Sequence, residues 1–158
     1  MYPFTTYNIA SAAGNTHMHA TLPTYQPVWT QYAITNAMVT ALGASTTGTL
    51  ELIGLPENTQ IWAAIVNVTT AETHLTTLTA TVGTGAGSYA DVISTAVDIH
   101  TVAQSALLSS SGGTVLSTPV TVQAGGDVVG VALTASGYNL STAVATVMKV
   151  SLLTYLPR

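Results

Sequence analysis

The chain has 158 residues, a net charge of −4 and no cysteine, and only 5% of its residues are charged, whereas an ordinary soluble domain has roughly a quarter. This composition excludes disulfides, thiolate metal sites and cysteine nucleophiles. Two basic residues are too few to bind nucleic acid by neutralising phosphates, and the apolar stretches are shorter than the ~20 residues of a transmembrane helix. We therefore expect a single all-β domain that binds neither nucleic acid nor membrane.

Residues 1–26 differ from the rest of the chain and are predicted to form an extended N-terminal arm. They show little periodicity, and Pro3, Pro23 and Pro27 disfavour helix and favour extended backbone. Apolar and aromatic residues in such a segment favour docking on a partner, the other reading being a disordered terminus. The predicted interface residues are Tyr2, Phe4, Tyr7, Ile9, His17, His19, Leu22, Tyr25 and Trp29.

Residues 27–158 are predicted to fold as one β-sandwich domain, because strand-length patterns alternate with turn residues. In the strongest of them, Ala64, Val66 and Val68 share one face with Trp62. About eight such strands favour a jelly-roll-like antiparallel sandwich. Strand patterns cover Val28–Thr35, Met38–Ala44, Thr47–Leu55, Gln60–Thr70, Leu75–Val82, Asp91–Ile99, Val115–Gln123, Val128–Ala135 and Thr142–Tyr155.

Two segments of the predicted domain fit the strand pattern less well. The stretch after Asp91–Ile99 has neither a strand nor a helix period, and we expect a helical turn near Val102–Leu107. Pro119 interrupts Val115–Gln123, which predicts an edge strand or a bulge because proline cannot donate a ladder hydrogen bond.

Three groups of residues invite a functional reading. Gly83–Gly87 is glycine-rich, but no Gly-Lys-Ser/Thr sequence or long helix follows it, so it is read as a connection between strands and not as a phosphate loop. His17 and His19 supply two of the three or four ligands that zinc needs, so a zinc site would require symmetry or a distant histidine. The third group, a calcium site from loop carboxylates, lacks EF-hand spacing; its candidate residues are Asp91, Asp98 and Asp127.

No catalytic signature is present in the sequence, and we expect neither an enzyme nor a bound cofactor or metal. A Gly-x-Ser-x-Gly motif is absent, and the acids and histidines are scattered. Trp29, Trp62 and the tyrosines could line a sugar-binding groove, although core packing and interface anchoring are the commoner roles of such residues.

The sequence over residues 47–155 resembles the small virion structural proteins of tailed bacteriophages. The resemblance is carried by TLELIGLPENTQIWAAIVNV, by LTATVGTGAGSYADVI, and by the closing segments DVVGVALTAS and VMKVSLLTY. It implies a capsid decoration, or cement, protein: a β-sandwich or jelly-roll trimer that sits over joints of the shell and reaches its neighbours with terminal arms. The family pattern has no catalytic residues to transfer.

The resemblance also implies partners and a location. The expected partners are the major capsid protein and further copies of this chain, as a homotrimer on the capsid exterior of the virion. The first residues lack the basic and apolar regions of a secretory signal, so we expect assembly in the host cytoplasm. The alternatives are a receptor- or glycan-binding module of a phage fibre, and a tail-tube or connector subunit.

Overall fold

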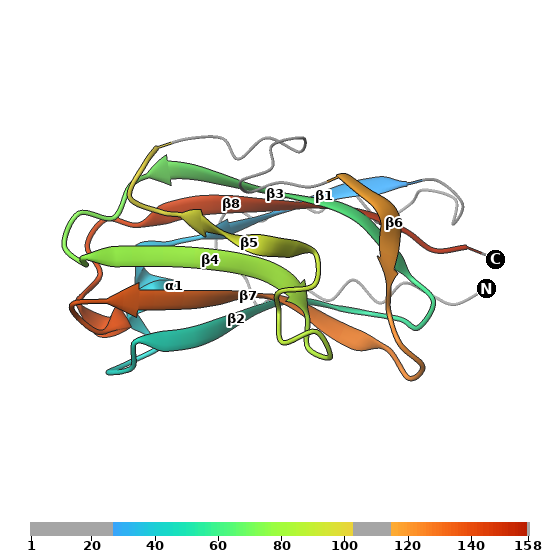
Figure 1. The fold of residues 1–158 in the computed structure, drawn as a ribbon, viewed down its shortest axis with the longest axis horizontal. Helices are drawn as coiled ribbons and strands as arrows, with labels where there is room; N and C mark the ends of the chain where they lie inside the picture. Colours follow the sequence, from blue (N-terminus) through green and yellow to red (C-terminus); the bar gives the residue numbers. More distant parts are fainter. Residues whose placement is uncertain (1–26, 103–114, 158) are drawn as a thin grey trace.

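The computed structural model describes residues 27–102 and 115–157 (Figure 1). These residues form eight strands, one short helix and one 3-10 turn, which confirms the prediction of an all-β sandwich. The strands are β1 (Val28–Ile34), β2 (Thr47–Leu55), β3 (Gln60–Thr70), β4 (Thr77–Thr84), β5 (Ile93–Asp98), β6 (Val115–Thr121), β7 (Asp127–Ser136) and β8 (Val147–Tyr155), the helix is α1 (Asn36–Thr40), and the 3-10 turn is η1 (Leu140–Thr142).

The strands form two four-stranded antiparallel sheets, one in the order β1-β8-β3-β6 and the other in the order β2-β7-β4-β5. The chain folds back on itself, so that β1 pairs with β8, β2 with β7, β3 with β6 and β4 with β5. Successive pairs alternate between the two sheets. This is the arrangement of a jelly roll, as the turn-separated strand patterns predict.

The core between the sheets is built from alternating side chains. Leu78, Ala80 and Val82 of β4 are buried, while the threonines between them are exposed or half-buried. Ala80 pairs with Leu133 of β7, and Val82 pairs with Val131, so the buried faces of the two strands lie side by side. This alternation of apolar and neutral polar residues lets the sandwich form without charged outer faces.

A bulge in β3 corrects the predicted position of Trp62. The pairing of β3 with β8 shifts register between Ile61 and Ala63. Ile61 and Ala64 are both buried in the core although they are three residues apart, so the bulge changes the alternation. Trp62 is half-buried and donates a hydrogen bond from Nε1 to Gln60 Oε1 at 3.2 Å; it does not share the core face of Ala64.

The prediction of a strand over Met38–Ala44 is wrong, because α1 and a turn occupy this segment. The N–H of Ala41 bonds to the carbonyl of Ala37, and Gly43 has a φ of 85°, the left-handed conformation that ends many helices. The segment carries the chain from β1 in one sheet to β2 in the other. One helical turn makes this short crossing and buries Val39.

The other boundaries differ from the prediction at strand ends. β8 begins at Val147 instead of Thr142, and β4 begins at Thr77 instead of Leu75. The segments before these two strands donate hydrogen bonds to the side chain of Glu72, from Thr146 and from Leu75, and are not paired as strands. β6, with Pro119, is an edge strand, as predicted. The predicted arm of residues 1–26 lies outside the described residues, as does the predicted helical turn after Val102.

Candidate functional site

Of the nine predicted interface residues, the structure describes one, Trp29. It lies in β1 with 38% of its surface exposed and is paired in register with Leu153 of β8. Along β1, Thr30, Tyr32 and Ile34 are buried and form the core face, so Trp29, which alternates with them, points away from the core. The other eight lie outside the described residues: Tyr2, Phe4, Tyr7, Ile9, His17, His19, Leu22 and Tyr25.

Trp29 belongs to an apolar surface on the outside of the sheet β1-β8-β3-β6. The register continues across the sheet from Trp29 to Leu153 and from Leu153 to Ala63, while Ile65 pairs with Ser151 in the next outward row. Lys149 is the only charged residue in the four strands of this sheet. We define the outer apolar face by the large apolar side chains of these outward rows and by Trp62, which bonds to Gln60 opposite Tyr155. Its members are the exposed Trp29 and the half-buried Trp62, Ile65, Leu153 and Tyr155.

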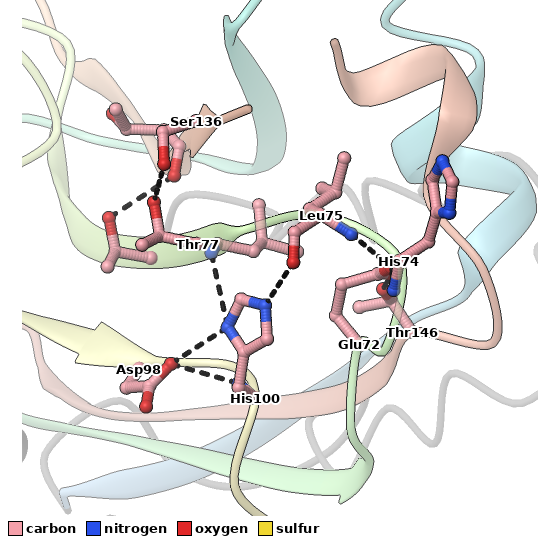
Figure 2. A network of polar contacts seen from close by, with 11 residues as sticks. Glu72, His74, Leu75, Thr77, Asp98, His100, Ser136 and Thr146 are labelled. Carbon is pink, nitrogen blue, oxygen red and sulfur yellow. Dashed lines mark hydrogen bonds and ion pairs between the residues drawn. The ribbon is translucent and has the colours of Figure 1, made fainter. Parts of the chain in front are cut away.

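At one end of the sandwich, a buried carboxylate organises the loops. Glu72, between β3 and β4, is 1% exposed. Its Oε1 accepts hydrogen bonds from the N–H groups of His74 at 2.7 Å and Leu75 at 3.2 Å, and its Oε2 accepts from the N–H of Val144 at 2.9 Å and the hydroxyl of Thr146 at 2.5 Å (Figure 2). All of these groups donate to the carboxylate, so the arrangement is matched to its ionised form.

The pKa of Glu72 is set by two opposing effects, its burial and its hydrogen bonds. Burial on its own would raise the pKa, but the hydrogen bonds from Thr146, His74, Leu75 and Val144 outweigh burial and lower it below the usual value for glutamate. Glu72 is therefore ionised in the folded protein at neutral pH and holds two loops together as a structural anion.

The same loops are fixed from the side of α1. Asn36 donates from Nδ2 to the carbonyl of Ala143 at 3.1 Å and accepts from the N–H of Thr146 at 3.2 Å. Between these points, Ala145 has a φ of 62°, a left-handed conformation that costs a non-glycine residue about 1 kcal/mol or more. The surrounding hydrogen bonds hold this backbone in place.

Two aromatic side chains from loops at this end of the sandwich stack on each other. The rings of His74, next to Glu72, and Tyr138, in the turn after β7, are stacked with centroids 4.6 Å apart and planes at 26°. His74 is exposed, and Tyr138 is 52% exposed. We call Tyr138 and His74 the aromatic pair; sequence alternation does not predict it, because the two residues are far apart in the chain and lie in loops.

His100 contacts a carboxylate at the same end, and this contact has a structural role. Its Nε2–H donates to the carbonyl of Leu75 at 2.8 Å, while Nδ1 lies 3.3 Å from the N–H of Leu78 and 3.1 Å from Asp98 Oδ1 (Figure 2). A neutral ring accepts from Leu78, and a protonated ring donates to Asp98. Both nitrogens are thus occupied, and neither is free to act as a general base.

The pKa of His100 is raised. The hydrogen bond to the Leu75 carbonyl has the largest effect, desolvation opposes it, and Asp98 adds to the increase through its hydrogen bond and its charge. The more distant charge of Glu72 acts in the same direction. Folding therefore makes His100 bind its proton more tightly than an ordinary histidine does.

The glycine-rich segment Gly83–Gly87 connects β4 to β5, as predicted, and carboxylates hold it in place. Asp91 accepts from the N–H of Thr84 at 2.6 Å and from its hydroxyl at 2.7 Å, and Asp127 accepts from the N–H of Ala86 at 2.9 Å. A Cβ added at Gly83 would lie 2.0 Å from Asp91 Oδ1. These aspartates shape a tight turn.

The residues considered for metal binding do not form a cluster in the described part of the chain. Within residues 27–102 and 115–157, no three His, Asp or Glu side chains are grouped in a way that could hold a metal ion.

The described residues also contain no helix with the length and apolar character needed to cross a membrane. Comparisons with known protein families, with curated proteins and with solved structures found no match.

Proposed function

We propose that this protein is a non-enzymatic virion structural protein that binds the outer surface of a phage capsid as a cement protein. The observation that carries the proposal is the outer apolar face, which presents Trp29 and Leu153 on a sheet whose strands contain one charged residue, Lys149. The proposed partners are the major capsid protein and further copies of the chain, with no nucleic acid, membrane or cofactor involved.

Covering such a face with a partner costs little free energy. Burial of apolar side chains is favourable by about 25 cal/mol per Å², whereas burial of an unpaired charge opposes association. A surface that combines large aromatic residues with almost no charge therefore suits a permanent interface, and tryptophan is enriched among the residues that dominate binding energy. The scarcity of basic residues favours the exterior of the shell, away from the packaged nucleic acid.

Introducing a charged residue into the outer apolar face by substitution tests this proposal. The full chain is mixed with shells of the phage that encodes it, and bound protein is measured by co-sedimentation. We expect Leu153→Lys to weaken binding by roughly tenfold or more, because it buries an unpaired charge at the centre of the face.

The matched control is Thr134→Lys, which adds the same charge at an exposed position of β7 in the other sheet. It should bind as the wild type does, and circular dichroism should show that both variants are folded. Equal binding of Leu153→Lys and wild type would rule out this face as the attachment surface.

A further inference from the structure

The loops around Glu72, at one end of the sandwich, form a largely apolar surface. Four large apolar side chains are exposed in the described residues, and three of them belong to loops at this end: Val102 after β5, Tyr138 after β7 and Val144 before β8. Segments 73–77 and 136–146 contain no Lys, Arg, Asp or Glu. Besides the imidazole of His74, their polar side chains are hydroxyls and one amide, Asn139. Further ionisable groups at this end are the buried Glu72 and the contacting pair Asp98 and His100.

The aromatic pair within this surface is held in a fixed position. The N–H of His74 bonds to the buried carboxylate of Glu72. On the other side of the pair, the N–H of Thr76 bonds to the carbonyl of Ser136 at 3.1 Å, and the hydroxyls of Thr77 and Ser136 are 2.6 Å apart (Figure 2). Because both loops are already ordered, a ligand that stacks on the pair would lose little free energy to further ordering.

The exposure of Tyr138 shows that the stack is open. His74 covers one face of the phenol ring, yet about half of the residue, 52%, is exposed. A residue whose role was to complete the core would be buried, as Leu75 and Leu140 are at the same end. A ring with one face stacked and this much exposed surface can accept a flat apolar partner on its second face.

The chemistry of the surroundings selects among such partners. A nucleotide would stack on the ring, but its phosphates need several cations. Segments 73–77 and 136–146 contain no Lys or Arg, and His100 already contacts Asp98. A pyranose sugar has an apolar face for the ring and hydroxyls for the neighbouring Thr, Ser and Asn groups, a combination typical of sites with an aromatic platform and a few polar contacts. Without Lys or Arg, these loop segments offer no counter-charge to a sulfated or sialylated sugar, which favours a neutral one.

We propose that Tyr138 and His74 form a binding site for a neutral saccharide, whose pyranose ring stacks on the open face of Tyr138. This site is separate from the outer apolar face and does not depend on the proposed attachment to a capsid. The rim hydroxyls, such as Thr76 beside Gly137, set which hydroxyl pattern of the sugar is accepted.

The full chain is tested on an array of neutral and anionic glycans, and the affinity of the strongest neutral oligosaccharide is measured by calorimetry. We expect Tyr138→Ala to weaken binding by roughly tenfold, because it removes the stacking surface, and Tyr138→Phe to retain binding within about threefold. Trp29→Ala, on the outer apolar face, is the matched control and should bind the glycan as the wild type does.

Three results would overturn the proposal: no neutral glycan bound above background, a preference for anionic glycans, or an unchanged affinity in Tyr138→Ala. The variants are checked for folding by circular dichroism. Capsid co-sedimentation of Tyr138→Ala should be unaffected, so that failure of the saccharide site and failure of the capsid attachment are separate outcomes.

Discussion

At the scale of single residues, Glu72 is the side chain on which the loop end depends most. It is buried and accepts hydrogen bonds from Leu75, Val144 and Thr146, among others. Replacing it removes a charge to which several buried donors are matched, and those donors lose their acceptor away from water. The energetic cost of a change here is therefore much larger than at an exposed acid.

We expect Glu72→Gln to lower the free energy of unfolding by about 2–4 kcal/mol, because the amide nitrogen cannot accept the hydrogen bonds of one carboxylate oxygen. The measurement is urea denaturation at pH 7. Glu51→Gln, at an exposed position of β2, is the control and should change stability by less than about 0.5 kcal/mol. Equal effects of the two variants would show that the Glu72 hydrogen bonds contribute little.

His100 gives the protein a dependence of stability on pH near neutrality. Its folded-state pKa is raised above the ordinary value, so its contribution is fully present below an unfolded-state pKa of about 6.5 and is lost as pH rises through the folded-state value. We expect the free energy of unfolding to fall as the pH rises above about 6.5. In His100→Gln this decline should be smaller; an identical decline in the variant would assign it to another group.

Residue roles were the hardest feature to predict from the sequence. Glu72 is one acid among threonines, and its partners Val144 and Thr146 are distant in the chain, so only the fold brings them together. The same holds for Tyr138 and His74. Trp29, in contrast, alternates with buried Thr30 and Tyr32, and its outward position follows from strand periodicity.

At the scale of elements, alternation identified strands well and failed where a short segment makes a crossing. β4 and β7 repeat an apolar residue at every second position, which defines a strand with one buried face. The segment of α1 has too few residues for either period to be distinguished, and its helical turn is imposed by the step from one sheet to the other. The β3 bulge likewise leaves no periodic signal.

The edges of the sheets bear on association. The edge strands are β1 and β6 in one sheet and β2 and β5 in the other. β1 and β6 contain no charged residue, and β2 and β5 contain one each, Glu51 and Asp98. Charged side chains are one of the devices that keep sheet edges from pairing with other chains, so these edges favour association.

At the scale of the whole molecule, we expect a closed homotrimer, because a closed assembly covers surfaces and edges that lack charge. Light scattering coupled to size exclusion should give a mass near three times the 16.1 kDa of the chain. A monodisperse monomer at micromolar concentration would contradict this expectation, whereas Leu153→Lys tests whether the outer apolar face contributes to the trimer.

The two proposed binding regions occupy different parts of the sandwich. The outer apolar face lies on the sheet β1-β8-β3-β6, and the aromatic pair lies in loops at the end where β3 and β7 finish (Figure 1). Val28, at the start of β1, pairs with Thr154, near the end of β8, so these two strand ends lie at the opposite end of the sandwich. One molecule can therefore use both regions at once.

The pairing of β1 with β8 also has a consequence for synthesis. Thr30 of the first strand finds its partner, Leu152, only in the last one, and such non-local pairing makes β-sandwiches slow to fold. While the ribosome completes the chain, β1 emerges without its neighbour, and its uncharged strand is exposed to other nascent chains. We therefore expect refolding of this chain to be slower than that of a protein of equal size whose strands pair with the next in sequence.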